Sequence, residues 1–210
     1  MTEPVPNLKS TCLFFGSFNP VHTGHLMIAQ AVINQFDFEH VLFIPAGTPP
    51  HRQTETDMAS ALDRFNMVRL ATAYHPRFRV SRVEVDKSGP SYTSETLSTW
   101  FPSFGKAGLT KIPMILGTDA LALIGSWHEA EALINSVTFY QAPRPETPLV
   151  KTTKFNGAEV ALDTVAIDMP PFATSSTWIR EQIQIGKDIH PWVHPDVRRY
   201  ILANHLWHKA

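Results

Sequence analysis

The sequence predicts a single α/β domain of the Rossmann-like, doubly wound class, with a mostly parallel sheet and helices on both faces. Short apolar runs of strand length alternate with longer segments whose apolar residues recur at helical spacing. The chain has 210 residues, of which 43% are hydrophobic and 18% charged, a composition typical of a globular domain. We expect a flexible tail over residues 1–10 and the domain over residues 11–210.

The first half of the chain contains three predicted strands. The run TCLFF (11–15) is typical of a buried strand, and a helix is predicted over 22–36. HVLFIPA (40–46) predicts a second strand, followed by a polar loop at 47–57 and a helix over 58–74. Apolar and polar residues alternate in FRVSRVEVD (78–86), which predicts a third strand. A turn at Lys-Ser-Gly-Pro then precedes a helix that starts near Ser91 or Thr93.

The second half repeats the alternation. KIPMILG (111–117) predicts the fourth strand, with short helices over 118–127 and 128–136. VTFYQ (137–141) predicts the fifth strand, and the Pro-rich segment that follows it is expected to be a surface loop. A sixth strand is predicted over 160–168, and two final helices over 175–185 and 194–207.

Charge and cysteine content exclude several classes of function. Lys and Arg total 18 and Asp and Glu total 19, so the near-neutral chain is unsuited to broad binding of nucleic acid or acidic membranes. The single cysteine, Cys12, excludes an internal disulfide and lies in an apolar run, where a buried, inert thiol is favoured over a nucleophile. The sequence has no membrane-span pattern and no signal-peptide layout at its start, so we expect a cytoplasmic protein.

The segment from Gly16 to His25 follows the first strand and opens a helix, where ligands bind in open parallel sheets. The free N–H groups at a helix start favour a phosphate, and His22 and His25 share one face of the first turn. Gly16 allows close approach of the backbone, and Gly24 leaves out a side chain that would block a ligand. The segment lacks the P-loop ending, and the alternatives are a metal-binding pair or two solvated histidines.

These residues, G-S-F-N-P-V-H-T-G-H, resemble the G-x-F-x-P-x-H-x-G-H signature of the nucleotidyltransferase superfamily. The resemblance implies the nucleotidyltransferase variant of the doubly wound fold. It also implies that His22 and His25 hold the phosphates of a bound nucleoside triphosphate.

A second helix start, Ser175-Ser-Thr-Trp-Ile-Arg180, follows the break at Pro170-Pro171. Hydroxyls, exposed N–H groups and a guanidinium at one helix start form an anion site, although an ordinary capped helix with a solvated arginine has the same pattern. The segment resembles the I-S-S-T-x-I-R motif of the adenylyltransferases, with Thr174 at a usually apolar position. The resemblance implies that Ser176, Thr177 and Arg180 bind the outer phosphates.

Other segments bear on the second substrate. Trp127 is suited to stacking on a flat ring or to core packing, and Thr93 to contacting a ligand or to capping a helix. Asp119, at the end of a strand, is suited to accepting from ribose hydroxyls or to capping a helix. His51 and Arg52 lie on a polar loop, where solvated charge is the alternative.

Together these segments resemble bacterial nicotinate-nucleotide adenylyltransferases from near residue 11 to the C-terminal helix. The resemblance implies two catalytic histidines, His22 and His25. It implies an ATP site of Gly16, Ser17, Phe18, Gly24, Gly117, Asp119, Ser176, Thr177 and Arg180. It implies an acceptor site of Asn19, His51, Arg52, Tyr92, Thr93 and Trp127. Asn19 stands where bacterial members often have Asp.

The implied reaction transfers AMP from ATP to nicotinate mononucleotide and releases pyrophosphate, within NAD biosynthesis. Mg²⁺ is expected to arrive with ATP, with no metal-binding residues of the protein's own. Nicotinamide mononucleotide and other phosphate acceptors remain alternatives, as do a nucleotide sensor without turnover and a nucleic-acid-binding module. The sequence leaves the oligomeric state open, a homo-oligomer included.

Overall fold

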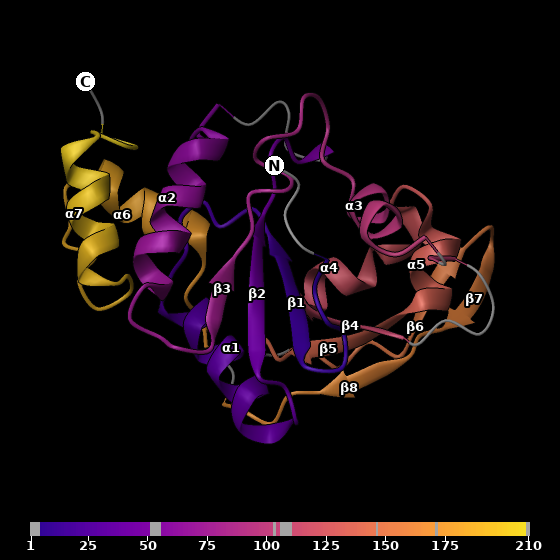
Figure 1. Ribbon diagram of the computed structural model, residues 1–210. Helices are drawn as coiled ribbons and strands as arrows, with labels where there is room; N and C mark the ends of the chain where they lie inside the picture. The colour runs from indigo at the N-terminus through magenta and orange to yellow at the C-terminus, as the bar shows by residue number, and fades with distance from the viewer. Residues whose placement is uncertain are drawn as a thin grey trace.

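The computed structural model describes residues 5–50, 56–102, 104–105, 111–145, 147–170 and 172–208. Within these ranges the main sheet has the strand order β3-β2-β1-β4-β5-β8, and every neighbouring pair is parallel (Figure 1). Its strands are β1 (Thr11–Gly16), β2 (His40–Pro45), β3 (Phe78–Val80), β4 (Ile112–Gly117), β5 (Val137–Ala142) and β8 (Thr164–Ala166). The predicted doubly wound α/β class is therefore confirmed.

The strand order reverses its direction between β1 and β4. The chain moves outward from β1 through β2 to β3, and then returns to place β4 on the other side of β1. Because the connections diverge at this point, the carboxyl ends of β1 and β4 border an open crevice, which is where ligands bind in such sheets.

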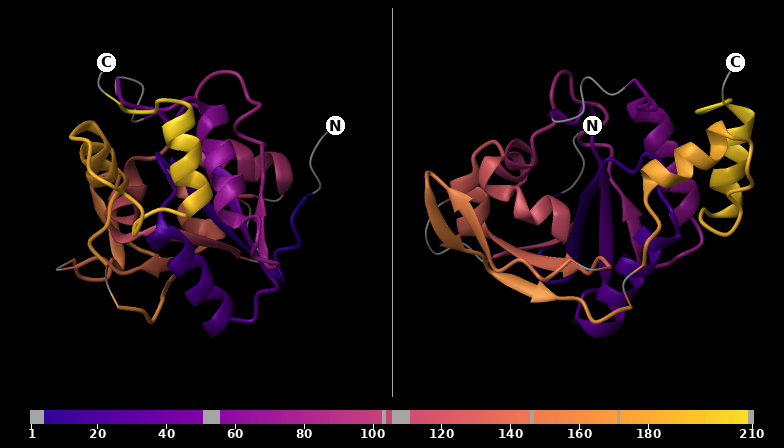
Figure 2. Two further views of the ribbon diagram at one scale, coloured as in Figure 1. Left: turned by 90° about the vertical axis from the view of Figure 1, so that its left-hand side faces the viewer. Right: turned by 180° about the vertical axis from the view of Figure 1, so that it is seen from behind.

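Helices cover both faces of the sheet (Figure 2). One buried cluster joins β1 and β2 to four helices: α1 (Thr23–Gln35), α2 (Ala61–Thr72), α6 (Ser176–Gln184) and α7 (Pro195–Ala203). The other joins the opposite face to α3 (Thr93–Trp100), α4 (Thr118–Ala122) and α5 (Ala130–Ser136). The helices α6 and α7 lie beside α2 at one end of the molecule (Figures 1 and 2).

The strand β1 shows why apolar runs without alternation form the centre of this sheet. Cys12 and Phe14 belong to the first cluster, whereas Leu13 and Phe15 belong to the second. All four side chains are at most 6% exposed. Since successive side chains point to opposite faces of a strand, a strand covered on both faces must be apolar at every position.

The predicted strand over 78–86 is wrong beyond Val80. Ser81 still donates its N–H to the Phe43 carbonyl, but its side chain then accepts from the N–H of Val83. Arg82 next forms an ion pair with Asp86 at 2.7 Å, four residues on. These local bonds favour a turn, because Ser side chains compete with the ladder for backbone donors.

The predicted loop and strand over 142–168 also need correction. An antiparallel hairpin of β6 (Thr152–Phe155) and β7 (Ala158–Ala161) lies at the end of the molecule opposite α7 (Figure 2). Its tight turn places Asn156 and Gly157 at positive φ, which these residues adopt readily. The predicted strand over 160–168 is therefore two strands, β7 and β8. The N–H of Leu162 still donates to the Lys151 carbonyl in register with the hairpin, whereas the Asp163 carbonyl accepts from the N–H of Phe139 in β5, so the chain changes sheets between these two residues.

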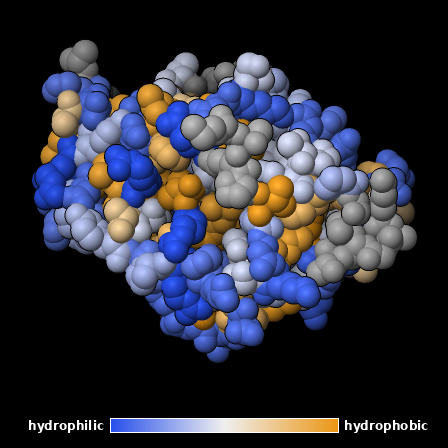
Figure 3. Space-filling view, viewed as in Figure 1, coloured by the Kyte–Doolittle hydropathy of each residue, from blue (hydrophilic) through white to orange (hydrophobic). Residues whose placement is uncertain are grey.

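Two further expectations concern single features. Cys12 is fully buried, and burial raises the pKa of its thiol far above the usual value, which agrees with an inert side chain. In the part of the chain that the structure describes, no helix is long and apolar enough to cross a bilayer. On the face seen in Figure 3, apolar residues gather near the middle and hydrophilic residues surround them.

Replacing Leu13 by Ala tests the double coverage of β1. Leu13 is 0% exposed, so we expect the free energy of unfolding to fall by about 2–5 kcal/mol. Leu62→Ala on α2 is the matched control, because Leu62 is 50% exposed and its loss is expected to cost less than about 1 kcal/mol. Urea unfolding of both variants measures the difference, and equal losses would contradict a core centred on β1.

Candidate active site

A cleft of about 690 Å³ opens at the carboxyl edge of the main sheet. The residues at or just beyond the ends of four strands line it: Gly16 of β1, Ala46 after β2, Gly117 of β4 and Ala142 of β5. Its volume is in the range of sites for small molecules and cofactors. The cleft therefore occupies the place at which the strand order predicts a ligand.

The structure brings most of the predicted site residues into this one cleft. The lining includes Gly16, Ser17, Phe18, Asn19, His22, His25, Tyr92, Thr93, Gly117, Asp119, Trp127, Ser176 and Thr177. Gly24 and Arg180 are described but do not line it. His51 and Arg52 lie outside the described residues.

The two histidines stack on one another at the start of α1. Their ring centroids are 3.7 Å apart, and His22 is the N-cap residue of the helix. The backbone N–H of His22 donates to Nδ1 of His25 at 3.2 Å. Because Nδ1 accepts this bond, the neutral His25 ring carries its proton on Nε2. His25 thus has a hydrogen-bond donor left for a ligand.

Both histidines are held in their neutral form. Burial lowers the pKa of His22 to about 3, and the Arg144 guanidinium adds to the shift. The pKa of His25 is also well below its usual value, because surrounding protein excludes water from the ring and because His22 and Arg144 disfavour a further positive charge. The pair can therefore donate hydrogen bonds at pH 7 without carrying charge. His22 Nδ1 is buried and has no hydrogen-bond partner among the described residues.

Arg144 supplies the positive charge near the histidines. It lines the cleft just after β5, with Nε 3.8 Å from an Asp119 carboxylate oxygen and its guanidinium 5.9 Å from the centre of the Phe172 ring. Its NH1 group donates to the Thr174 carbonyl at 3.3 Å. These contacts place a permanent cation between the start of α4 and the segment that leads into α6.

The two glycines of the first motif are required by aromatic rings of the chain itself. A Cβ on Gly16 would lie 2.9 Å from the Phe18 ring, and one on Gly24 would lie 1.9 Å from the Phe172 ring. The prediction that Gly24 clears space for a ligand is therefore corrected, because Phe172 fills that space. The need for glycine comes from close packing beside the site.

The start of α6 forms one wall of the cleft. Ser175 is its N-cap, accepting from the N–H of Trp178 at 3.1 Å, and the hydroxyl of Ser176 donates to the Pro20 carbonyl at 2.8 Å. Ser175, Ser176 and Thr177 all line the cleft. The second motif thus lies against the first, as two segments that face one ligand must.

Arg180, which the motif predicts to bind phosphate, makes its hydrogen bonds within the protein in this structure. It is only 4% exposed, and its Nε lies 2.6 Å from a carboxylate oxygen of Asp57. Its NH1 group donates to the Asn19 carbonyl at 2.9 Å. In this structure Arg180 joins protein segments behind the cleft, because its position on α6 points it toward the core and not toward the helix start.

Asn19 also makes its bonds within the protein. Its side-chain amide donates to the Asp57 carbonyl at 3.1 Å and accepts from the N–H of Ala59 at 3.0 Å. Asn19 is 1% exposed, although it lines the base of the cleft. Its side chain fixes the segment that precedes α2, and both its donor and its acceptor are occupied.

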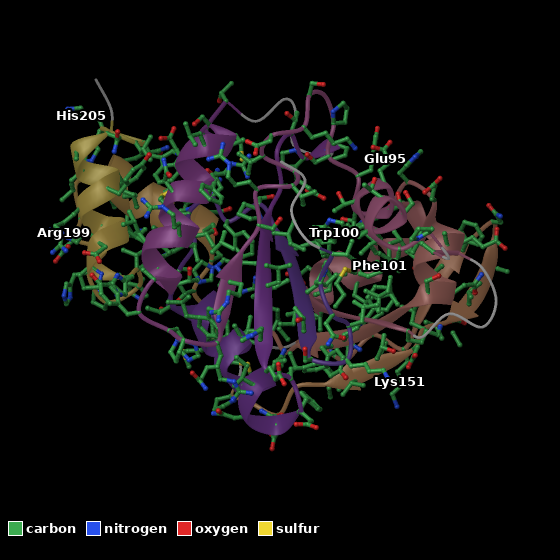
Figure 4. The ribbon with its side chains drawn as sticks, viewed as in Figure 1. Glu95, Trp100, Phe101, Lys151, Arg199 and His205 are labelled. Carbon is green, nitrogen blue, oxygen red and sulfur yellow. The ribbon has the colours of Figure 1, made fainter. Side chains whose placement is uncertain are left out.

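The other wall of the cleft carries aromatic side chains. Tyr92 precedes α3 as its N-cap residue, and its ring lies 4.4 Å from that of His128, the residue after Trp127. Nε2 of His128 is 3.9 Å from Glu95, which also pairs with Lys87. Figure 4 shows Glu95 on α3, on the opposite side of the molecule from Arg199 and His205. This wall combines flat rings with charged groups at its rim.

Glu84 is a buried carboxyl at the edge of the cleft that sequence reasoning missed. It is 2% exposed and accepts a hydrogen bond of 2.8 Å from the hydroxyl of Thr96. Burial raises the pKa of Glu84 to about 7, while that bond and the nearby Lys87 and Arg64 act in the opposite direction. The prediction of a strand over 78–86 includes Glu84 but does not single it out as a site residue.

Arg144, His128 and Phe172 are among the other cleft residues that fell outside the predicted site. Arg144 could have been found, because it follows a predicted strand at the same sheet edge. His128 could have been found from its place next to Trp127. Phe172 gives no such signal, since only the folded chain brings it to Gly24. The described residues contain no group of three His, Cys, Asp or Glu side chains that could hold a metal ion.

The model of the family described as cytidylyltransferase-like matches residues 13–182, which is most of the chain. The chain belongs to the cytidylyltransferase-like family.

The curated relatives narrow this family further. A protein of Synechococcus sp. (strain JA-3-3Ab), named a probable nicotinate-nucleotide adenylyltransferase, is 36% identical over 99% of each chain. One of Acidothermus cellulolyticus with the same name is 39% identical over 93% of this chain and 92% of the relative. Within its family, this chain groups with the nicotinate-nucleotide adenylyltransferases.

A solved structure supports the fold. It is the nicotinic acid mononucleotide adenylyltransferase of Plasmodium falciparum complexed with NaAD, which superposes with a TM-score of 0.72. The superposition covers 94% of this chain and 97% of that one at 19% sequence identity. At this identity the match shows that the two chains share a fold.

Replacing Glu84 by Gln tests the buried carboxyl. A raised pKa means that the folded state holds a proton that the unfolded state releases. The protonated carboxyl therefore contributes its full stabilisation below pH 4.5, and this contribution to the free energy of unfolding is lost as the pH rises toward 7. We therefore expect the free energy of unfolding of Glu84→Gln to rise, relative to that of the wild type, by roughly 2–3 kcal/mol from pH 5 to pH 8.

Urea unfolding at the two pH values measures this gain. Glu39→Gln is the control for the loss of a carboxyl at the surface, since Glu39 is exposed. A Glu84→Gln variant whose difference from the wild type is the same at pH 5 and pH 8 would show that Glu84 ionises normally.

Proposed function

We propose that this protein transfers the adenylyl group of ATP to nicotinate mononucleotide, forming nicotinate adenine dinucleotide and pyrophosphate. The observation that carries the proposal is the stacked pair of His22 and His25 at the base of one cleft. The α6 hydroxyls form one wall of this cleft, and Tyr92 and Trp127 lie on the other. The names of the relatives support the same substrates.

The triphosphate of ATP is proposed to lie between α1, α6 and Arg144. Thr177 and the start of α6 offer a hydroxyl and a helix N-terminus, both of which favour phosphate oxygens. Arg144 offers the charge that the neutral histidines lack. Mg²⁺ is proposed to enter with ATP, coordinated by phosphate oxygens and water, as this ion prefers.

The chemistry requires little proton transfer. An oxygen of the acceptor phosphate attacks the α-phosphorus of ATP, and the bond from that phosphorus to the bridging oxygen of the β-phosphate breaks. The attacking oxygen is already anionic, so no general base is needed. The Nε2–H of His25 donates to the α-phosphate as charge builds on its oxygens, and a phosphate oxygen at His22 Nδ1 gives that buried atom a partner.

The acceptor ring is proposed to lie against the aromatic wall. Tyr92, Trp127 and His128 present flat rings there, and the start of α3 at Thr93 presents N–H groups and a hydroxyl. A pyridine carboxylate matches both features, because its ring can stack and its oxygens can accept from a helix start. Nicotinamide mononucleotide is the second candidate, since it differs only in that one group.

A panel of acceptors tests the proposal directly. The protein is incubated with ATP, Mg²⁺ and one of nicotinate mononucleotide, nicotinamide mononucleotide, pantetheine phosphate or a sugar phosphate, and pyrophosphate release is measured. We expect the highest kcat/KM with nicotinate mononucleotide and the dinucleotide as its product. Preference for a non-pyridine acceptor would overturn the proposed substrate, and no pyrophosphate with any acceptor would favour a nucleotide sensor.

Replacing His25 by Ala should lower kcat by about 10²–10³-fold, because the donor to the developing charge is lost. His190→Ala is the matched control, since His190 is exposed and lies away from the cleft. Rapid-quench or steady-state turnover of both variants gives kcat, and their thermal midpoints show whether each is folded. Full turnover by a folded His25→Ala variant would refute the mechanism.

A further inference from the structure

Asp57 lies where three distant segments of the chain meet. Its carboxylate pairs with Arg180 of α6 at 2.6 Å. Its carbonyl accepts from the side-chain amide of Asn19 at 3.1 Å and from the indole N–H of Trp207 at 2.7 Å. One residue therefore joins the histidine-bearing turn, the second motif and the C-terminal segment. We call Asn19, Asp57, Arg180 and Trp207 the clasp.

The clasp is closed by bonds among its own members. Arg180 donates to the carbonyl of Asn19 at 2.9 Å, so two of the three residues that bond Asp57 also bond each other. Asn19 and Arg180 are 1% and 4% exposed. Side chains that are so fully buried and bonded within the protein are suited to holding a geometry, because a change of partner would leave a buried polar group unsatisfied.

The turn that the clasp holds is the one that carries the histidines. Asn19 precedes His22 by three residues, and the same turn is held at Pro20 by Ser176. The N–H of Thr23, just after His22, donates to the carbonyl of Trp192 at 2.8 Å. The start of α1 is therefore positioned by α6 and by the C-terminal part of the chain. The sheet fixes only the end of β1, from which the chain leads to α1.

Trp207 itself is held in an unusual conformation. Its φ is +61°, in the left-handed region that residues with side chains rarely adopt. Such a backbone persists where surrounding contacts over-determine it. The indole bond to Asp57 and the packing of Trp207 against the cluster around α1, α2, α6 and α7 are the contacts on this residue. Figures 1 and 2 show the C-terminal end beside α2.

We propose that Asp57 and Trp207 are positioning residues for adenylyl transfer, which makes the C-terminal segment part of the machinery that sets His22 and His25. The proposal rests on the proposed function. It assigns Arg180 to the clasp, in place of the phosphate contact that its motif suggests. Small displacements of a catalytic group can reduce turnover by up to about 100-fold, so a positioning role has a measurable effect.

Two conservative variants each remove one interaction of the clasp. Asp57→Asn removes the charge that pairs with Arg180 and keeps the shape of the side chain. Trp207→Phe removes the indole donor and keeps an aromatic ring. Asp188→Asn is the control for the first, because Asp188 forms an exposed ion pair of 2.8 Å with Arg198 away from the cleft. Trp100→Phe on α3 (Figure 4) is the control for the second, because it disturbs the other core cluster.

The expected result separates positioning from stability. At temperatures where all four variants are folded, Asp57→Asn and Trp207→Phe should each lower kcat/KM for ATP by about tenfold, against less than about twofold for the controls. The double variant should lose less than the product of the two single losses, because both release the same segment. Amide hydrogen exchange without substrates should be faster at residues 19–23 in both clasp variants only.

Each other outcome overturns the proposal. Equal losses of kcat/KM in the clasp variants and the controls would show that the clasp contributes to stability and not to positioning. Tighter ATP binding by Asp57→Asn would show that the freed Arg180 binds phosphate and that Asp57 competes for it. If the wild type transfers AMP to no acceptor, the proposed function fails, and unchanged exchange at 19–23 would then independently refute the clasp.

Discussion

The parallel pairing of β1 with both β2 and β4 is the constraint on which the rest of the structure depends. It makes β1 a strand covered on both faces and sends the chain outward in two directions. The reversal leaves the carboxyl ends of β1 and β4 side by side, with a gap between the connections that lead away from them. The cleft, the histidine pair and the α6 hydroxyls all lie around this gap. The strand order thus determines where the site lies, and the individual residues determine what it can bind.

The electrostatics of the site follow from its burial. Excluding water around His22 and His25 keeps both rings neutral, so they act as directed donors. The permanent charge is left to Arg144, which the sheet brings in from β5. Histidines that donate directed hydrogen bonds, together with an arginine that supplies the charge, are suited to binding a polyanionic substrate. The donors keep their protonation state while the cation attracts the ligand.

The sequence predicted correctly most of the features that depend on residues close together in the chain, and failed where the contact is with a distant residue. The runs at 11–15, 40–46, 111–117 and 137–141 are apolar throughout and gave the correct strands. The alternation at 78–86 was misleading, because it arises from a turn held by Ser81 and Arg82. His25 and Thr177 line the cleft, as the prediction of one shared site requires. Arg180 does not line it, and its ion pair with Asp57 could not be predicted because Asp57 lies 123 residues away along the chain.

The contact between Gly24 and Phe172 has a consequence for how this sequence can vary. The ring of Phe172 occupies the space that any side chain at position 24 would need. An alanine there would require the Phe172 ring to move or to be replaced by a smaller side chain. The glycine between the histidines is therefore coupled to a position almost 150 residues away. Natural variation at position 24 should thus be restricted wherever an aromatic ring is kept at position 172, even though Phe172 lies outside both motifs.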